Sequence, residues 1–214
     1  MRQLIPLILV FIGATAANAQ EIGPDDLWSA LLTGNRHYVE GKLSYENLAA
    51  ERAQFGDHQS PPITVLSCSD SRVPPELIFN QSLGALFVIR AAGNVVDTFG
   101  LASIEYAIAH GFTSLIVVLG HEECGAVETA LGHGEGSTPA ITGLLERIRS
   151  SFGGIEWKAD DPAVVKRAIE ANARASAASL PAQSRIVREA MLAGKLKIVS
   201  AYYDLDTGEV KRVE

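Results

Sequence analysis

Residues 63–72 read I-T-V-L-S-C-S-D-S-R, and this stretch decides the fold of the 214-residue chain. Its first half is short, apolar and β-branched, which predicts a buried strand. The strand is followed by Cys68, Asp70 and Arg72, so a thiol, a carboxylate and a guanidinium lie beyond its carboxyl end. In open α/β sheets, ligands bind at that end of the strands. The stretch therefore predicts a functional site at the edge of a sheet.

A second strand end repeats this pattern further along the chain. Residues 115–119 read L-I-V-V-L, and G-H-E-E-C-G follows them. Cys68 and Cys124 are the only two cysteines of the chain, and His121 lies close to the second one. Zinc takes thiolate and imidazole ligands, and a catalytic zinc site has three protein ligands and one open position. We therefore predict one zinc ion per subunit, bound by Cys68, His121 and Cys124.

Asp70 and Arg72 flank the open position of this predicted site. Two residues apart on an extended segment, their side chains face the same side. A charge-assisted pair with Arg72 would keep Asp70 ionised. Asp70 would then either orient a zinc-bound water or ligate the zinc itself and close the site. A structural ion pair without a catalytic role is the alternative.

Strands alternate with helices along the rest of the chain. This order favours an α/β fold with a central, mostly parallel four-stranded sheet, an added antiparallel edge strand, and helices on both faces. Periodicity and turn residues predict strands at 63–67, 86–90, 114–119, 197–203 and 209–213. The same signals predict helices at 25–41, 45–54, 76–79, 99–110, 124–131, 141–151, 162–179 and 184–193.

The first nineteen residues have the pattern of a secretory signal peptide. Arg2 supplies a positive charge, residues 4–12 are apolar, and Ala17-Asn18-Ala19 matches a cleavage site. We expect residues 1–19 to be removed and residues 20–214 to form a single domain in the periplasm or outside the cell. An uncleaved N-terminal anchor is the alternative, although the apolar run is short for a membrane span.

The charge of the chain excludes two classes of partner. The formal net charge is −7, and it becomes −8 when Arg2 is removed with the signal peptide. Proteins that bind nucleic acid carry a basic patch, and anionic lipid attracts basic segments. We therefore expect a small-molecule substrate, no nucleic acid, and no membrane association after signal cleavage.

Exported proteins with two cysteines often hold one disulfide bond. A bridge from Cys68 to Cys124 would contribute about 4 kcal/mol in the chain-entropy model. A non-catalytic exported domain with such a bridge is therefore the alternative to an enzyme. The histidine and the carboxylate beside the cysteines favour the metal site.

Three motifs together resemble the β-class carbonic anhydrases: C-S-D-S-R at 68–72, F-V-I-R-A-A-G-N-V at 87–95, and G-H-E-E-C-G-A-V at 120–127. The resemblance implies that the cysteines and His121 bind zinc and that Asp70 and Arg72 form a catalytic dyad. It also implies that Gln59, Phe87 and Tyr106 line the substrate pocket. Family members form dimers, often paired into tetramers, with the pocket at the subunit interface, so we expect a homodimer or homotetramer.

The implied reaction is the reversible hydration of carbon dioxide to bicarbonate and a proton, by attack of zinc-bound hydroxide. Val65 stands where the bicarbonate-regulated subgroup has tryptophan, so we expect no regulatory bicarbonate site. We also expect Val65 to contribute to the apolar wall of the pocket. A zinc hydrolase of the same fold that acts on carbon disulfide or carbonyl sulfide is the alternative enzyme, because its ligands would be identical.

Overall fold

The computed structural model describes residues 22–45, 47–132, 134–153 and 161–214. The predicted signal peptide therefore lies outside the described residues. The five strands are β1 (Ile63–Ser67), β2 (Leu86–Arg90), β3 (Leu115–His121), β4 (Lys197–Tyr203) and β5 (Val210–Arg212). The α-helices are α1 (Pro24–Val39), α2 (Leu48–Gln54), α3 (Pro75–Ile78), α4 (Thr98–Ala109), α5 (Gly125–Leu131), α6 (Pro139–Arg149), α7 (Pro162–Gln183) and α8 (Arg185–Leu192). Two 3-10 turns, η1 (Ala92–Asn94) and η2 (Ser150–Phe152), complete the described elements.

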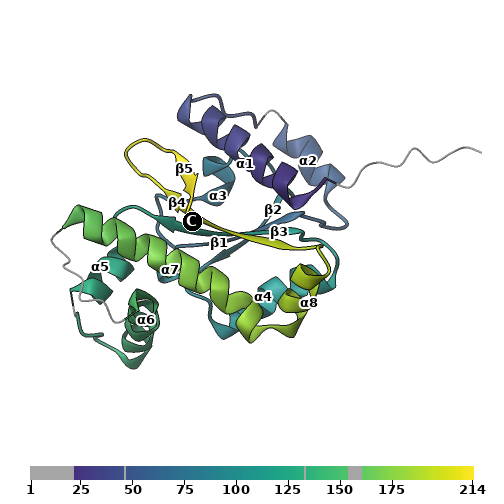
Figure 1. The fold of residues 1–214 in the computed structure, drawn as a ribbon. Coiled ribbons are helices and arrows are strands. Elements are labelled where there is room, and N and C mark those ends of the chain that lie inside the picture. Colours follow the sequence, from purple (N-terminus) through teal and green to yellow (C-terminus); the bar gives the residue numbers. More distant parts are fainter. Residues whose placement is uncertain (1–21, 46, 133, 154–160) are drawn as a thin grey trace, which may run out of the picture.

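The strands form one sheet in the order β2-β1-β3-β4-β5 (Figure 1). β1 to β4 are parallel, and β5 pairs antiparallel with β4. This confirms the predicted mostly parallel sheet with an added antiparallel edge strand. It also places the carboxyl ends of β1, β2 and β3 at one edge of the sheet, because parallel strands run in the same direction.

Alternate side chains of the central strands enter two separate cores. Val65 and Val117 face α1 and pack with Leu31, whereas Leu66 and Val118 face α4, α7 and α8. This is the period of two expected for a strand. Both faces are buried because helices lie on each side of the sheet, α1 on one and α7 on the other (Figure 1).

A third apolar cluster lies around α5, α6 and part of α7. It includes Cys68 and Cys124 together with Val127, Ile148 and Ile169. The two cysteines are therefore surrounded by packed apolar side chains rather than by solvent. A buried and tightly packed wall of this kind restricts the positions that their sulfur atoms can take.

Most element boundaries differ by a few residues from those predicted from the sequence, and two of the differences are informative. β3 extends to His121 instead of stopping at Leu119, because its last residues pair with β4, with His121 opposite Tyr203. α7 continues to Gln183 although it contains Pro181. The extension of β3 matters for the site, since it places His121 on a rigid strand end.

Candidate metal centre

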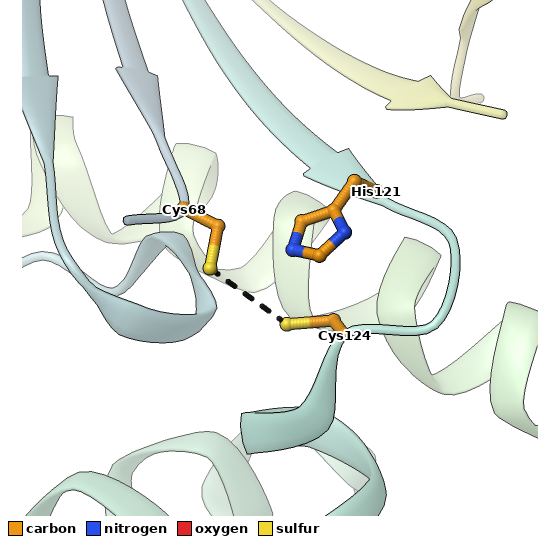
Figure 2. Close-up of side chains that lie close together, drawn as sticks. All are labelled: Cys68, His121 and Cys124. Atoms are coloured by element: carbon orange, nitrogen blue, oxygen red, sulfur yellow. Dashed lines mark hydrogen bonds between the residues drawn. The ribbon is translucent and has the colours of Figure 1, made fainter. Parts of the chain in front are cut away.

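Three side chains with soft donor atoms meet at the carboxyl edge of the sheet. Cys68 directly follows β1, His121 is the last residue of β3, and Cys124 caps the amino end of α5. β1 and β3 pair in parallel with Ser67 opposite Leu119, so their ends reach the same edge. Figure 2 shows the imidazole ring facing the two sulfur atoms.

The donor atoms of these three residues all lie within 4.8 Å of one another. The two sulfur atoms are 4.0 Å apart, and both cysteines are free. A disulfide bond is about 2.05 Å long, so the two thiols are adjacent but not bridged. Cys68, His121 and Cys124 are 6%, 0% and 1% exposed, respectively, so all three are buried.

The hydrogen bonding of His121 leaves one nitrogen for a metal. Nδ1 lies 2.7 Å from the carbonyl oxygen of Glu122, so it carries the proton and donates it to that oxygen. Nε2 is buried and has no hydrogen-bond partner among the residues that the structure describes. A buried polar atom without a partner costs about 1–3 kcal/mol. A zinc ion among the three donors would use that nitrogen, and metal-binding histidines commonly bond a carbonyl in this way. The donor set therefore fits zinc.

The pKa values of the two thiols are shifted in opposite directions in the metal-free protein. A hydrogen bond from the Cys124 thiol lowers the pKa of Cys68, and the backbone N–H of Gly93, 3.3 Å from the Cys68 sulfur, acts in the same direction. The same contact with Cys68, together with burial, raises the pKa of Cys124. The pair therefore favours a thiolate at Cys68, and because zinc binds thiolates, its binding releases protons that the pair still carries.

Asp70 and Arg72 form the predicted ion pair. Nε and one terminal nitrogen of Arg72 donate to the two carboxylate oxygens of Asp70 over 3.0 and 2.9 Å. The backbone N–H of Arg72 donates to the same carboxylate over 2.9 Å. The hydrogen bonds from Arg72 lower the pKa of Asp70 to about 2. Asp70 is therefore an anion that faces the site, and one of its oxygens lies 3.9 Å from Nε2 of His121.

Two residues that sequence reasoning did not select hold this pair in place. Glu123 accepts hydrogen bonds from Arg72 through its carboxylate and its backbone carbonyl, both over 3.2 Å. Arg90, the last residue of β2, donates to the carbonyl oxygens of Cys68 and Asp70. Glu122 accepts from the backbone N–H of Leu205 over 2.9 Å. Neither glutamate belongs to the donor cluster.

The three predicted substrate-binding residues lie apart from this centre within one chain. Gln59 is exposed in the loop before β1. Phe87 is paired with Thr64, four residues before Cys68, so it lies about 13 Å along the sheet from this zinc ligand at 3.3 Å per residue. Tyr106 on α4 stacks on Phe87, with ring centroids 6.4 Å apart. The structure therefore brings Phe87 and Tyr106 together, but away from the donor cluster.

Val65 does not have the position expected for a pocket wall. It is fully buried in β1 and packs in the cluster under α1. Its side chain has no exposed surface with which to contact a substrate, so that expectation was wrong. The reason is that Val65, three residues before Cys68, still lies within the core of a sheet covered on both faces.

The fold is an open α/β sheet, and a Cys-His-Cys donor set lies at the carboxyl ends of its parallel strands. These two features define a zinc-binding α/β protein. Comparison with known proteins narrows this class. The family model described as carbonic anhydrase matches residues 63–210. Carbonic anhydrase 2 of Mycobacterium tuberculosis is 36% identical over 189 residues, which cover 86% of this chain and 90% of that protein.

Solved structures agree with the sequence matches. A β-carbonic anhydrase of Aspergillus fumigatus has a TM-score of 0.71 at 26% identity and is covered to 90%, with 87% of this chain matched. A β-carbonic anhydrase of Coccomyxa has a TM-score of 0.67 at 27% identity, with coverage of 86% of this chain and 85% of that chain. The chain therefore belongs to the β-class carbonic anhydrase family. Within the described residues, no helix is both long and apolar enough to span a membrane.

Proposed function

We propose that this protein catalyses the reversible hydration of carbon dioxide to bicarbonate and a proton at a zinc ion held by Cys68, His121 and Cys124. The observation that carries the proposal is the cluster of three buried donors, in which Nε2 of His121 has no partner within the described part of the chain. Three protein ligands are the number found in catalytic zinc sites. Membership of the carbonic anhydrase family supports the same reaction.

Zinc, when bound, lowers the pKa of water from 15.7 to about 7 and so supplies a hydroxide nucleophile at neutral pH. The chain's own residues position the reactants. Asp70 is ionised throughout the neutral range, so it can only accept a hydrogen bond, and it orients the nucleophile by accepting one. Arg72 occupies both oxygens of Asp70 and keeps this carboxylate from becoming a fourth zinc ligand. In this proposal the resting site is open.

Gln59, Phe87 and Tyr106 act on the substrate of a neighbouring subunit in our proposal. They lie away from the donor cluster of their own chain, and Tyr106 remains 47% exposed. On the same face of α4, one heptad earlier, Phe99 is 82% exposed. β2 is an edge strand beside them. An exposed aromatic surface next to an open strand edge is suited to a second copy of the chain, so the enzyme is a homodimer or a homotetramer.

Tetrameric β-carbonic anhydrases of Sordaria macrospora support this assembly. Their fold is similar to that of this chain, with a TM-score of 0.68 at 25% identity, and the match covers 87% of this chain and 96% of theirs.

A stopped-flow assay of carbon dioxide hydration on protein of known zinc content tests the proposed reaction. We expect hydration in proportion to bound zinc, and no hydration by Cys124→Ser. Carbon disulfide and carbonyl sulfide should be tested in parallel, because the same ligands would serve a hydrolase of either compound. Turnover of these sulfur compounds without carbon dioxide hydration would overturn the proposal.

We also propose that the protein is exported after cleavage behind Ala19. The support is the charged, apolar and small-residue pattern of residues 1–19. N-terminal sequencing of protein from a fractionated host should find Gln20 as the first residue in the periplasmic or secreted fraction. Soluble protein that retains Met1 in the cytosol would contradict the export proposal and leave the proposed reaction untouched.

A further inference from the structure

Gly93 in η1 is held on both sides by groups that link the zinc ligands to α7. Its N–H donates to the sulfur of Cys68 over 3.3 Å. Its carbonyl oxygen accepts a hydrogen bond from the side-chain amide of Asn172 over 2.6 Å. Asn172 and Cys68 are thus connected through a single glycine, although they are far apart in the sequence.

The backbone conformation of Gly93 explains why hydrogen bonds on both sides of this residue matter. Its φ of +63° and ψ of +23° lie in the left-handed region. A Cβ at this position would lie 2.7 Å from Cδ1 of Ile148, so no larger residue fits without movement of its neighbour. Glycine meets both demands, but it is also the residue with the greatest backbone freedom. The hydrogen bond from Asn172 to its carbonyl oxygen restricts this freedom.

Asn172 is a polar side chain at a buried position in a helix, where an apolar residue is more common. It lies in the middle of the 22-residue helix α7 and is 2% exposed. Asparagine is a weaker helix former than the alanines on either side of it, and burial of an amide without a hydrogen bond is costly. Its amide reaches across to η1 rather than to its own helix. The bond to Gly93 therefore accounts for an amide at this buried position.

We propose that Asn172 is a positioning residue of the zinc centre. It fixes Gly93 so that the N–H of Gly93 donates to the Cys68 thiolate, and it thereby preorganises the site for zinc. This inference rests on the zinc site of the proposed function. Asn172 acts only through Gly93 and Cys68, and none of its own contacts is with substrate. Zinc affinity depends on Asn172 because a glycine without this hydrogen bond would lose conformational freedom when the metal binds.

Zinc affinity measured by competition with a chelator tests the proposal without any activity assay. We expect Asn172→Ala to weaken zinc binding by about 10-fold or more, the range found when a group that supports a metal ligand is removed. Alanine favours helix, so α7 should be retained. If that variant does not fold, Asn172→Ser gives the same readout, because its hydroxyl is too short to reach Gly93.

Cobalt substitution supplies a second readout at the sulfur itself. A hydrogen bond to a thiolate withdraws electron density from its lone pairs. Loss of the N–H donor should therefore move the thiolate-to-cobalt charge-transfer band of the Asn172→Ala protein to longer wavelength. A general loss of stability would not move this band.

Asn35 provides a matched control. It is also a buried asparagine in a helix, 4% exposed, and its amide donates to the carbonyl oxygens of Ile78 and Gly208 over 3.1 and 2.8 Å. Asn35→Ala should lower stability but leave the zinc affinity and the cobalt spectrum unchanged.

The outcomes separate this inference from the proposed function. Wild-type protein that binds no zinc would refute the zinc site, and this inference with it. If the wild type binds zinc, an Asn172→Ala protein whose affinity is within twofold and whose cobalt band is unmoved would overturn the inference alone. An equal loss of zinc affinity in Asn35→Ala would also overturn it, because the cause would then be general destabilisation.

Discussion

One carboxylate oxygen of Asp70 lies 3.9 Å from Nε2 of His121, while Arg72 donates to both oxygens of the same carboxylate. The carboxylate is therefore near the ligand nitrogen but is held by another partner. In a buried site, this difference decides whether a carboxylate orients a water molecule or binds the metal. The arrangement makes Arg72 the residue on which the state of the site depends.

Arg72→Ala should release Asp70. Its carboxylate would then be free to approach zinc, and we expect carbon dioxide hydration at pH 7 to fall by about 10-fold or more, with the zinc content unchanged. The comparison of activity at pH 7 and pH 9 checks this, since the loss should be largest at neutral pH. Activity equal to that of the wild type at pH 7 would show that Arg72 does not control Asp70.

The pH profile of the wild type should follow one ionisation. The pKa of Asp70 is about 2, so this residue does not titrate in the neutral range. The rate should rise smoothly through a pKa near 7, as expected when a single group supplies the nucleophile. Added bicarbonate should act only as the product, without cooperative inhibition. An enzyme silent below about pH 8 that then switches on steeply would indicate a second conformation instead.

The lowered pKa of Asp70 also predicts the acid dependence of stability. Its folded-state pKa of about 2 lies below the unfolded value of about 3.9, so the pair with Arg72 contributes stability above that unfolded value. This contribution is lost as the pH falls towards 2. Asp70→Asn should therefore destabilise zinc-free protein at pH 6, and the difference from wild type should shrink below pH 4. Urea unfolding at several pH values measures it, and a difference independent of pH would argue against the assignment.

Phe99→Asp should disrupt the proposed subunit interface. Phe99 is 82% exposed, and an aspartate there would be buried without a partner if a second subunit covers α4. We expect sedimentation to show a smaller species, with lower activity but full zinc content. Ile141→Asp on α6, where the native side chain is 41% exposed, is the control. A Phe99→Asp protein that keeps both the size and the rate of the wild type would place the interface elsewhere.

Much of the fold follows from local patterns in the sequence. Apolar β-branched runs marked the four parallel strands, a turn marked the short fifth strand, and the alternation of strands with helices correctly indicated the parallel sheet. The sequence did not show that β3 continues through His121, because this depends on pairing with Tyr203 of β4. It also did not show that Val65, in the predicted buried strand, is kept from the pocket, which depends on α1 covering that face of the sheet.

The site was predictable only in part for the same physical reason. Cysteine and histidine types at strand ends identify donors, and their spacing places them at one edge. The supporting contacts join residues distant in sequence and carry no local signal: Glu123 with Arg72, Arg90 with the carbonyl of Cys68, and Asn172 with Gly93. Nothing in the local sequence around Gly93 indicates that its N–H donates to the sulfur of Cys68. Only the folded backbone brings these groups together.

The most direct test of the central claim is the zinc content and carbon dioxide hydration rate of the wild type beside those of Cys124→Ser. Wild-type protein should bind one zinc per chain and hydrate carbon dioxide, and the variant should lose both, because a three-ligand site cannot spare a thiolate. A variant that retains one zinc per chain, or a wild type that hydrates carbon dioxide equally well after its metal is removed, would contradict the account.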